Sequence, residues 1–327
     1  MFLMRFDLRA PGADATGRAA RYRTAIEMSA WAEERGCVSV VLSEHHSSED
    51  GYLASPLTLA ASIAAVTRNV RIVVAATLLP LHDPVRLAEE IIALDHISEG
   101  RVLVVLGLGY RPEEYELAGL DYRRRARLAD ERLAELLDVL DTAGDTSAWP
   151  RVTPAPFSPP RRRLAWGGRS IAAARRAGRF GIGFFAQTDG AGLAEAYEQA
   201  ATEAGHTPGL CLLPPPEMPL IVFVNDDLDE GWNDVGEAMA LDARGYYEWS
   251  SVAGTAERTA SFSKASDVES LRAANGAHRV VSATQAKQLV AEYFVLGLHP
   301  LCGGLDPQLA WEYLRRAADA VGPPRFG

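Results

Sequence analysis

The sequence has 327 residues, of which 48% are hydrophobic and 23% are charged, and its formal net charge is −10. This length suits one large α/β domain, and the negative charge argues against nucleic acid and anionic membranes as partners. No run of about 18 apolar residues predicts a membrane span, and the N-terminus lacks a signal-peptide pattern. Because Cys37, Cys211 and Cys302 lack CxxC spacing, the sequence predicts neither a metal site nor disulfides. We therefore expect a soluble cytoplasmic protein.

Short β-branched runs alternate with helical patterns along most of the chain, which is typical of a parallel sheet. The predicted strands are Phe2–Leu8, Val38–Ser43, Val70–Leu79, Val102–Leu108, Arg163–Trp166, Ile182–Ala186 and Leu220–Val224. A helix over Arg18–Arg35 is expected to end at Gly36, since glycine readily takes the left-handed conformation. Ser55-Pro56 and Asp83-Pro84 predict helix starts, because each joins a capping side chain to a proline at the first helical position.

The last third of the chain carries weaker signals. Apolar spacing over Gln285–Leu296 favours a helix that ends at Gly297, followed by a short eighth strand over His299–Cys302. Asp226–Ser282 shows no strand alternation and is interpreted as an insertion that shapes the mouth of the active site. We predict a single (β/α)8 TIM barrel over the whole chain, with this insertion between strand 7 and helix 8. A two-domain boundary near Pro150–Pro160 is the alternative.

In such a barrel, functional residues gather at the carboxyl ends of the strands. The run Ser43-Glu44-His45-His46 follows a predicted strand and offers a proton donor or acceptor that titrates near neutral pH. Consecutive strand residues point to opposite faces, so at most one of the two histidines is expected to face a pocket. A histidine satisfied within a loop is the alternative interpretation.

Two glycine-containing runs also follow predicted strands. Gly107-Leu108-Gly109 allows a close backbone approach to a ligand, but the run by itself favours a tight turn. Trp166-Gly167-Gly168-Arg169-Ser170 leads into a helix whose N-terminus favours phosphate, with a plain helix cap as the alternative. At the end of the third strand, Ala75-Ala76 followed by bulky aliphatic residues would make a flat apolar wall for a planar ring, or ordinary barrel core.

Taken in order, these runs resemble the bacterial luciferase-like monooxygenase family. The resemblance is densest over roughly residues 1 to 140 and looser beyond residue 160. It rests on Glu44-His45-His46, Ala54-Ser55-Pro56-Leu57, Ala75-Ala76-Thr77-Leu78-Leu79-Pro80, His82-Asp83-Pro84-Val85-Arg86-Leu87-Ala88-Glu89-Glu90, Leu94-Asp95-His96-Ile97-Ser98-Glu99-Gly100-Arg101, Gly107, Gly109, Asp121 and Gly167-Gly168-Arg169-Ser170.

The resemblance implies a monooxygenase that receives reduced FMN from a separate reductase and oxygenates a small organic substrate with O2 through a flavin C4a-peroxide. His45 corresponds to the acid–base histidine of the family. Ala75 and Ala76 match a pair joined by a non-proline cis peptide beneath the flavin, and Ser170 matches a phosphate ligand. The residues expected to contact the cofactor are Glu44, Ala75, Ala76, Gly107, Gly109, Arg125, Gly167, Gly168, Arg169 and Ser170. The resemblance also implies a homodimer.

Three positions depart from the family pattern, and at one of them Gln187 or Thr188 replaces the tryptophan expected after strand six. Leu108 stands where luciferases place a phosphate-binding arginine, and Ala173 stands where a threonine ligand is usual. Arg125 or Arg127 is expected to compensate. These departures leave two alternatives open, an F420-dependent hydride-transfer enzyme and a catalytically silent flavin-binding barrel.

Overall fold

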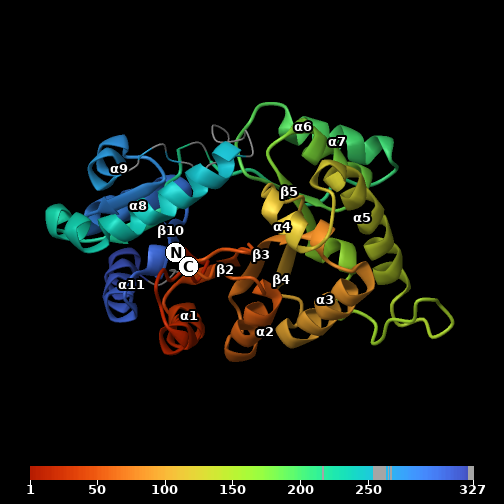
Figure 1. Cartoon of the computed structure of the whole chain (residues 1–327), viewed down its shortest axis with the longest axis horizontal. Helices are drawn as coiled ribbons and strands as arrows, with labels where there is room; N and C mark the ends of the chain where they lie inside the picture. The colour runs from red at the N-terminus through yellow and green to blue at the C-terminus, as the bar shows by residue number, and fades with distance from the viewer. Residues whose placement is uncertain (216, 253–262, 264, 266, 323–327) are drawn as a thin grey trace. The chain divides into compact units, whose positions relative to one another are not determined.

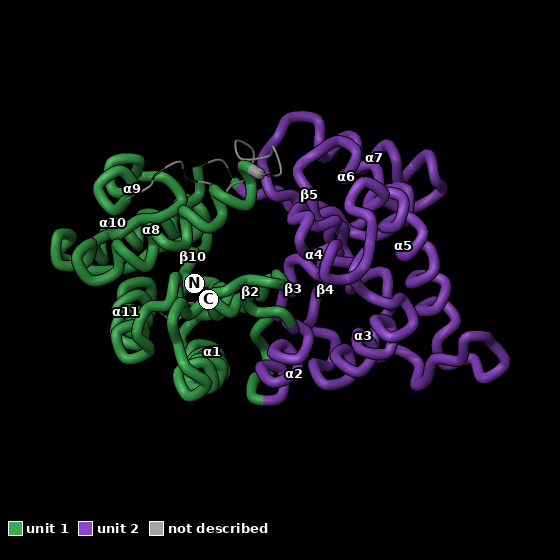
Figure 2. Tube along the Cα trace, in the orientation of Figure 1, with its two compact units in different colours: residues 1–54, 66–71, 215–327 green, residues 55–65, 72–214 purple. Residues whose placement is uncertain are grey.

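The computed structural model describes residues 1–215, 217–252, 263, 265 and 267–322 (Figure 1). The chain divides into two compact units, which Figure 2 colours separately. Unit 1 comprises residues 1–54, 66–71 and 215–327, and unit 2 comprises residues 55–65 and 72–214. Residues 150–160 lie inside unit 2, so the boundary does not fall at the proline-rich segment considered above.

Unit 1 contains the first strands of the chain and nearly all of its last third. Its elements are β1 (Phe2–Phe6), α1 (Ala15–Glu33), β2 (Cys37–Leu42), β8 (Ile221–Val224), α8 (Leu228–Val252), α9 (Val268–Ala274), β9 (His278–Val281), α10 (Ala283–Tyr293), β10 (Leu296–Leu298), the 3₁₀ turn η4 (Cys302–Gly304) and α11 (Pro307–Val321).

Parallel pairing joins the strands of unit 1. β1 pairs with both β10 and β2, and β8 pairs with β9. Exposure alternates along β1, where Phe2, Met4 and Phe6 are fully buried. This period of two places one face of the strand in the hydrophobic core and turns Arg5 to the other face.

Unit 2 contains the middle of the chain. Its elements are α2 (Pro56–Val66), β3 (Arg71–Leu78), η1 (Leu79–Leu81), α3 (Pro84–Ser98), β4 (Val102–Gly107), α4 (Pro112–Leu117), η2 (Tyr122–Arg124), α5 (Arg125–Thr142), η3 (Pro160–Arg163), β5 (Leu164–Gly168), α6 (Ile171–Arg179), β6 (Gly183–Ala186), α7 (Leu193–Glu203) and β7 (Cys211–Leu212). The first residue of β3 and the last residue of α2 belong to unit 1.

The strands of unit 2 run parallel in the order β3-β4-β5-β6-β7, and three strands of unit 1 run in the order β10-β1-β2. β8 and β9 form a separate pair. The α/β class and the parallel arrangement are therefore confirmed. The helix starts at Pro56 and Pro84 are also confirmed, and the Asp83 side chain caps α3 by accepting from the Arg86 amide at 2.9 Å.

The C-terminal third differs from the sequence prediction at two places. Asp226–Ser282 does contain a strand, β9, which pairs with β8. The eighth strand was placed too late, because α10 ends at Tyr293 and Phe294 takes the left-handed conformation with φ of 65°. Gly297 therefore lies inside β10, where a Cβ atom would come within 2.8 Å of the Leu220 carbonyl oxygen.

The interpretation of residues 226–282 as an insertion stays a prediction, and residues 253–262, 264 and 266 within it lie outside the described residues. None of the helices in the described ranges combines the length and the hydropathy that crossing a bilayer requires.

Candidate functional site

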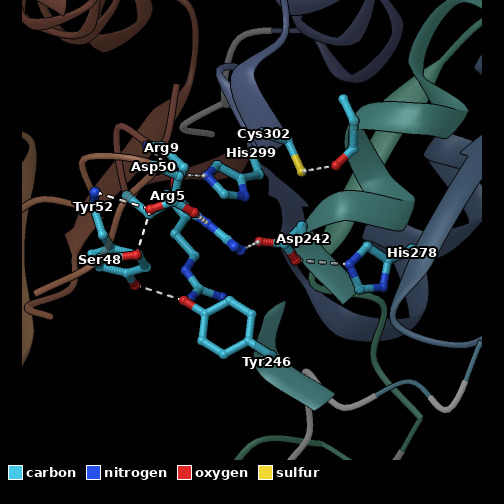
Figure 3. A network of polar contacts seen from close by, with 12 residues as sticks. Arg5, Arg9, Ser48, Asp50, Tyr52, Asp242, Tyr246, His278, His299 and Cys302 are labelled. Atoms are coloured by element: carbon cyan, nitrogen blue, oxygen red, sulfur yellow. Dashed lines mark hydrogen bonds and ion pairs between the residues drawn. The ribbon is translucent and has the colours of Figure 1, made fainter. Parts of the chain in front are cut away.

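Three charged side chains follow one another on alternate positions at the end of β1. Arg5 is half-buried, Asp7 is fully buried and Arg9 is only 4% exposed. Charged groups are costly to bury unless other charges and hydrogen bonds compensate them. The fold therefore has to bring partners to this strand end, and those partners come from the loop after β2, from α8 and from the segment after β10 (Figure 3).

Arg9 lies between two carboxylates and an aromatic ring. Its Nε donates to Asp50 Oδ2 at 2.5 Å, and its Nη1 lies 3.8 Å from Asp242 Oδ1. The guanidinium carbon lies 5.2 Å from the centre of the Trp249 ring. Burial by itself would lower the pKa of Arg9, but Asp7, Asp242 and Asp50 raise it above its usual value. Arg9 is therefore a permanent cation.

Asp7 carries the matching negative charge. The Arg9 amide donates to Asp7 Oδ1 at 3.1 Å, and His299 Nε2 lies 3.3 Å from the same oxygen. Burial opposes ionisation of this carboxyl group, but His299, Arg9 and Arg5 hold its pKa well below the usual range. Asp7 is therefore ionised at neutral pH.

Asp242 on α8 is the second buried carboxylate, and it accepts from His278 on β9. Asp242 Oδ2 and His278 Nε2 are 2.9 Å apart, and both side chains have no exposed surface. Burial opposes ionisation here too, but contact with His278 and proximity to His299 lower the Asp242 pKa. Asp242, His299 and Cys302 bring one potential metal-ligand atom each to within 4.8 Å of one another.

Two tyrosines link Arg5 to the loop after β2. The hydroxyl groups of Tyr52 and Tyr246 are 2.6 Å apart, and Arg5 donates to the Tyr246 hydroxyl (Figure 3). Burial raises the pKa of both phenols, although the Arg5 charge opposes this shift. Both hydroxyl groups are therefore protonated at neutral pH, so each can donate one hydrogen bond and accept another.

His45 lies against Tyr52 and Trp249. Its ring centre is 4.8 Å from that of Tyr52, in an edge-to-face arrangement, and 4.8 Å from that of Trp249. The side chain is only 6% exposed, and the His45 amide donates to the Leu53 carbonyl at 3.2 Å. His46 is less buried and lies 2.8 Å from Glu44 Oε1. The two histidines, which both follow the end of β2, thus have different surroundings.

In unit 2, the predicted cofactor residues at the ends of β3, β4 and β5 lie close together. The Ala75–Ala76 peptide bond is cis, and the β3–β4 register shifts between Ala75 and Thr77. A Cβ atom at Gly107 would lie 2.8 Å from the Ala76 Cβ, and one at Gly167 would lie 3.9 Å from it. The small side chains are therefore required where these strand ends approach one another.

The start of α6 has the geometry of an anion site. Ser170 is the N-cap, and its hydroxyl accepts from the Ala173 amide at 3.2 Å. A Cβ atom at Gly168 would lie 2.5 Å from the Ala173 Cβ, so the chain turns tightly into the helix. Ser170 is exposed and Arg169 is half-buried. The first amides of a helix have no intrahelical acceptor, so this turn presents N–H donors outward.

The remaining predicted residues of unit 2 make local contacts. The Arg125 guanidinium carbon lies 3.9 Å from the Tyr122 ring centre, and its Nη1 donates to the Tyr122 carbonyl at 3.0 Å. Arg127 pairs with Glu131 on the exposed face of α5. Gly109 has a φ of 73°, which requires glycine or an equally permissive residue. The expected compensation by Arg125 or Arg127 stays a prediction.

Sequence reasoning missed the buried charges of unit 1. The missed residues are Arg5, Asp7, Arg9, Asp50, Tyr52, Asp242, Tyr246, His278, His299 and Cys302. A signal was present, because β1 continues into charged residues at alternate positions, which a strand facing only apolar neighbours would not tolerate. Their partners are too far away in sequence to be assigned from a pattern.

The fold and the site together define a parallel α/β protein with a buried histidine at the end of a strand. The chain belongs to the luciferase-like monooxygenase family, whose model matches residues 2–298. This confirms the family inferred from the sequence motifs.

Individual relatives agree with this assignment. The chain is 32% identical over 115 residues to a 4-hydroxyprotoasukamycin monooxygenase from Streptomyces nodosus subsp. asukaensis, covering 35% of this chain and 30% of the relative. Matches to the curated relatives span only about a third of those relatives' own length.

Solved structures match over a greater length. The oxygenating constituent of a 3,6-diketocamphane monooxygenase from Pseudomonas putida, in complex with FMN, has a TM-score of 0.70 at 22% identity and covers 98% of this chain and 97% of its own. An F420-dependent secondary alcohol dehydrogenase has a TM-score of 0.63 at 16% identity and covers 98% of both chains. Identities this low establish the fold alone.

Proposed function

We propose that this chain is a flavin-dependent monooxygenase that takes reduced FMN from a separate reductase and uses O2 to oxygenate a small organic substrate. Family membership supports the class of reaction. The observation that carries the proposal within the chain is the placement of His45, buried at the end of β2 between the rings of Tyr52 and Trp249. A homodimer and a cytoplasmic location remain part of the same proposal.

The residues of unit 2 fit a flavin phosphate and ring. When bound, reduced flavin would supply the electrons that activate O2. Ser170 and the first amides of α6 would bind the phosphate, with Arg169 adding positive charge beside them. Ala75, Ala76 and Gly107 leave little side-chain volume at the ends of β3 and β4, as close approach of a planar ring requires.

His45 would hold or move a proton in surroundings that exclude water. The flanking rings fix the orientation of the imidazole, and burial keeps bulk solvent from exchanging its protons. Tyr52 and Tyr246 extend this polar region towards Arg5 through their hydroxyl groups. His46, which pairs with Glu44, is the less buried of the two and is assigned no role in proton transfer.

The decisive measurement is an anaerobic titration of the full chain with reduced FMN, followed by stopped-flow mixing with O2. We expect saturable binding and a transient absorbance that differs from both reduced and oxidised flavin. Reoxidation at the rate of free FMN would contradict the proposal. The His45→Ala variant should bind FMN within about twofold of the wild type but lose oxygenation of any turned-over substrate by about 10²- to 10⁴-fold. His46→Ala is the matched control, and equal losses in both variants would remove the assigned role of His45.

The phosphate assignment can be tested without turnover. Ser170→Asp preserves an N-cap acceptor and adds a negative charge, so the helix should be retained while binding of reduced FMN weakens by at least about tenfold. Asp83→Ser makes a similar cap exchange at α3 and serves as the control. Unchanged FMN affinity in Ser170→Asp would place the phosphate elsewhere.

A second candidate function is F420-dependent hydride transfer, which is favoured by the structural likeness to an F420-dependent dehydrogenase. Such an enzyme would bind F420 and exchange hydride with its substrate without consuming O2. Tight binding of F420 with no binding of FMN, and no O2 uptake during turnover, would favour this candidate over the monooxygenase.

A further inference from the structure

Three side chains with metal-binding atoms converge inside unit 1. Asp242 lies on α8, and His299 and Cys302 lie just after β10 (Figure 3). One potential ligand atom from each lies within 4.8 Å of the other two. Asp242 and His299 have no exposed side-chain surface, and Cys302 is also fully buried.

Two possible ligand atoms lack a hydrogen-bond partner among the residues that the structure describes. They are His299 Nδ1 and Asp242 Oδ1, which lies 3.8 Å from Arg9 Nη1. A buried polar atom without a partner costs free energy, so native proteins satisfy such atoms with another group, a water molecule or an ion. A carboxylate oxygen and an imidazole nitrogen that converge on a thiol form a set of donors suited to one metal ion.

The surrounding residues orient the two non-sulfur donors in the way that metal sites do. His278 donates to Asp242 Oδ2, while Oδ1 makes no hydrogen bond and lies 3.8 Å from Arg9 Nη1. Asp7 Oδ1 lies 3.3 Å from His299 Nε2, and His299 Nδ1 makes no hydrogen bond to a described residue. A histidine that presents one nitrogen to a carboxylate and the other to the metal is the usual arrangement around zinc.

We propose that Asp242, His299 and Cys302 bind one zinc-class divalent ion in the interior of unit 1. Oxygen, nitrogen and thiolate ligands at about 2.0–2.3 Å from a tetrahedral ion stand roughly 3.3–3.8 Å apart. Starting from 4.8 Å, the three atoms have to close by about 1 Å, which side-chain rotation can supply.

The charges near the cluster are of both signs. Asp7, Asp50 and Asp242 lie near Arg5 and Arg9, and the buried Arg21 is a third guanidinium group, close to Asp7 and Cys302. Binding would replace the S–H proton of Cys302 by a sulfur–metal bond and release that proton to solvent.

The sequence does not predict this site, because the recognisable sequence pattern for zinc is a pair of closely spaced cysteines. The donors are instead of three kinds, with His299 and Cys302 three positions apart and Asp242 far away on a different helix. The ion would join α8 to the segment after β10, and this role does not depend on the chemistry proposed for His45.

The test uses the full chain without a polyhistidine tag, incubated with Zn²⁺, dialysed and analysed by mass spectrometry for metal content. We expect about one zinc per chain, and an X-ray absorption spectrum with one sulfur and otherwise nitrogen or oxygen neighbours. Less than about 0.1 zinc per chain, or a spectrum without sulfur, would overturn the proposal whatever any variant does.

Cobalt substitution locates the ion. Co²⁺ bound to a cysteine thiolate gives a ligand-to-metal charge-transfer band, which should disappear in Cys302→Ala and persist in Cys211→Ala. Asp7→Asn removes the charge that orients His299 and should weaken Zn²⁺ binding about 10- to 100-fold with the sulfur ligand retained. Circular dichroism verifies that each variant is folded. A charge-transfer band that persists in folded Cys302→Ala would place the ion elsewhere and refute this assignment.

Discussion

The ends of the strands are built differently in the two units. At the end of β1 in unit 1, Asp7 and Arg9 are buried and are compensated by Asp50, Asp242 and other groups from distant segments. Near the ends of β3, β4 and β5 in unit 2, small residues such as Ala76, Gly107 and Gly167 approach one another closely. One unit depends on charge compensation and the other on the close approach of backbones.

This contrast shows which kind of substitution each unit should resist. Removing one member of a compensated charge cluster leaves the others buried without a partner, which is costly. Adding a methyl group where two backbones nearly touch forces the strands apart, which is costly for a steric reason. The predictions below test whether the two units differ in this way.

The largest effect is expected from Asp242→Asn. The substitution keeps the shape but removes a buried charge that faces Arg9 and His278. We expect the free energy of unfolding to fall by about 3 kcal/mol, the lower part of the range for breaking a buried ion pair. Urea unfolding in the presence of a chelator measures this without any contribution from metal. Asp229→Asn, which breaks the exposed pair with Arg272, should cost less than about 0.5 kcal/mol. Equal costs would mean that burial is not what matters at Asp242.

A smaller effect is expected from Gly107→Ala in unit 2. The new Cβ would lie 2.8 Å from the Ala76 Cβ, so one strand end must move. We expect a loss of about 1–3 kcal/mol in urea unfolding. Adding Ala76→Gly removes the clashing atom and should restore part of the loss, so the two substitutions should not be additive. Gly209→Ala, where the nearest atom would be 3.6 Å away, is the control. Additivity in the double variant would exclude the contact as the cause.

The smallest effect is pH-dependent and concerns Cys37 at the start of β2. Burial raises the pKa of this thiol to about 12, and the nearby Glu33 adds to the shift. In the unfolded chain the thiol ionises near pH 8.5. Because the folded-state pKa is the higher one, the stability that the thiol contributes is complete below about pH 8.5 and is lost as the pH rises towards 12.

The slope of this loss is about 1.4 kcal/mol per pH unit within that window. Cys37→Ala should flatten the alkaline limb of the unfolding free energy by that amount, measured by urea titrations between about pH 9 and 10.5. The half-buried Cys211 provides the comparison, since Cys211→Ala should change the slope less. An unchanged slope in Cys37→Ala would show that another group controls the alkaline limb.

The sequence predicts the regular part of the fold well and the irregular part poorly. Strands such as β4 are continuous apolar runs, so their position follows from composition alone. β9 was missed because it has only four residues, His278–Val281, and two of them are charged or titratable. The end of α10 was misplaced because Phe294 takes the left-handed conformation that glycine usually takes, which the residue type does not predict.

The candidate site divides in the same way. Ser170 as a helix cap and the cis bond between Ala75 and Ala76 were anticipated from local motifs and family resemblance, because each depends on neighbouring residues. The partners of Arg9 and Asp7 were not anticipated, because Asp242 and His299 follow them by more than 230 positions. A local pattern identifies a side chain that needs a partner but not the partner that the fold supplies.

The side of α8 that faces the charged cluster limits which insertions and deletions the helix can tolerate. Asp242, Tyr246 and Trp249 are spaced four and three residues apart, so they project from one side of the helix towards Arg9, Arg5 and His45. Insertion or deletion of a single residue before Asp242 would turn all three away by about 100°. We therefore expect insertions and deletions in the first half of this helix to be rare in related enzymes. Point substitutions on its outward side should be common.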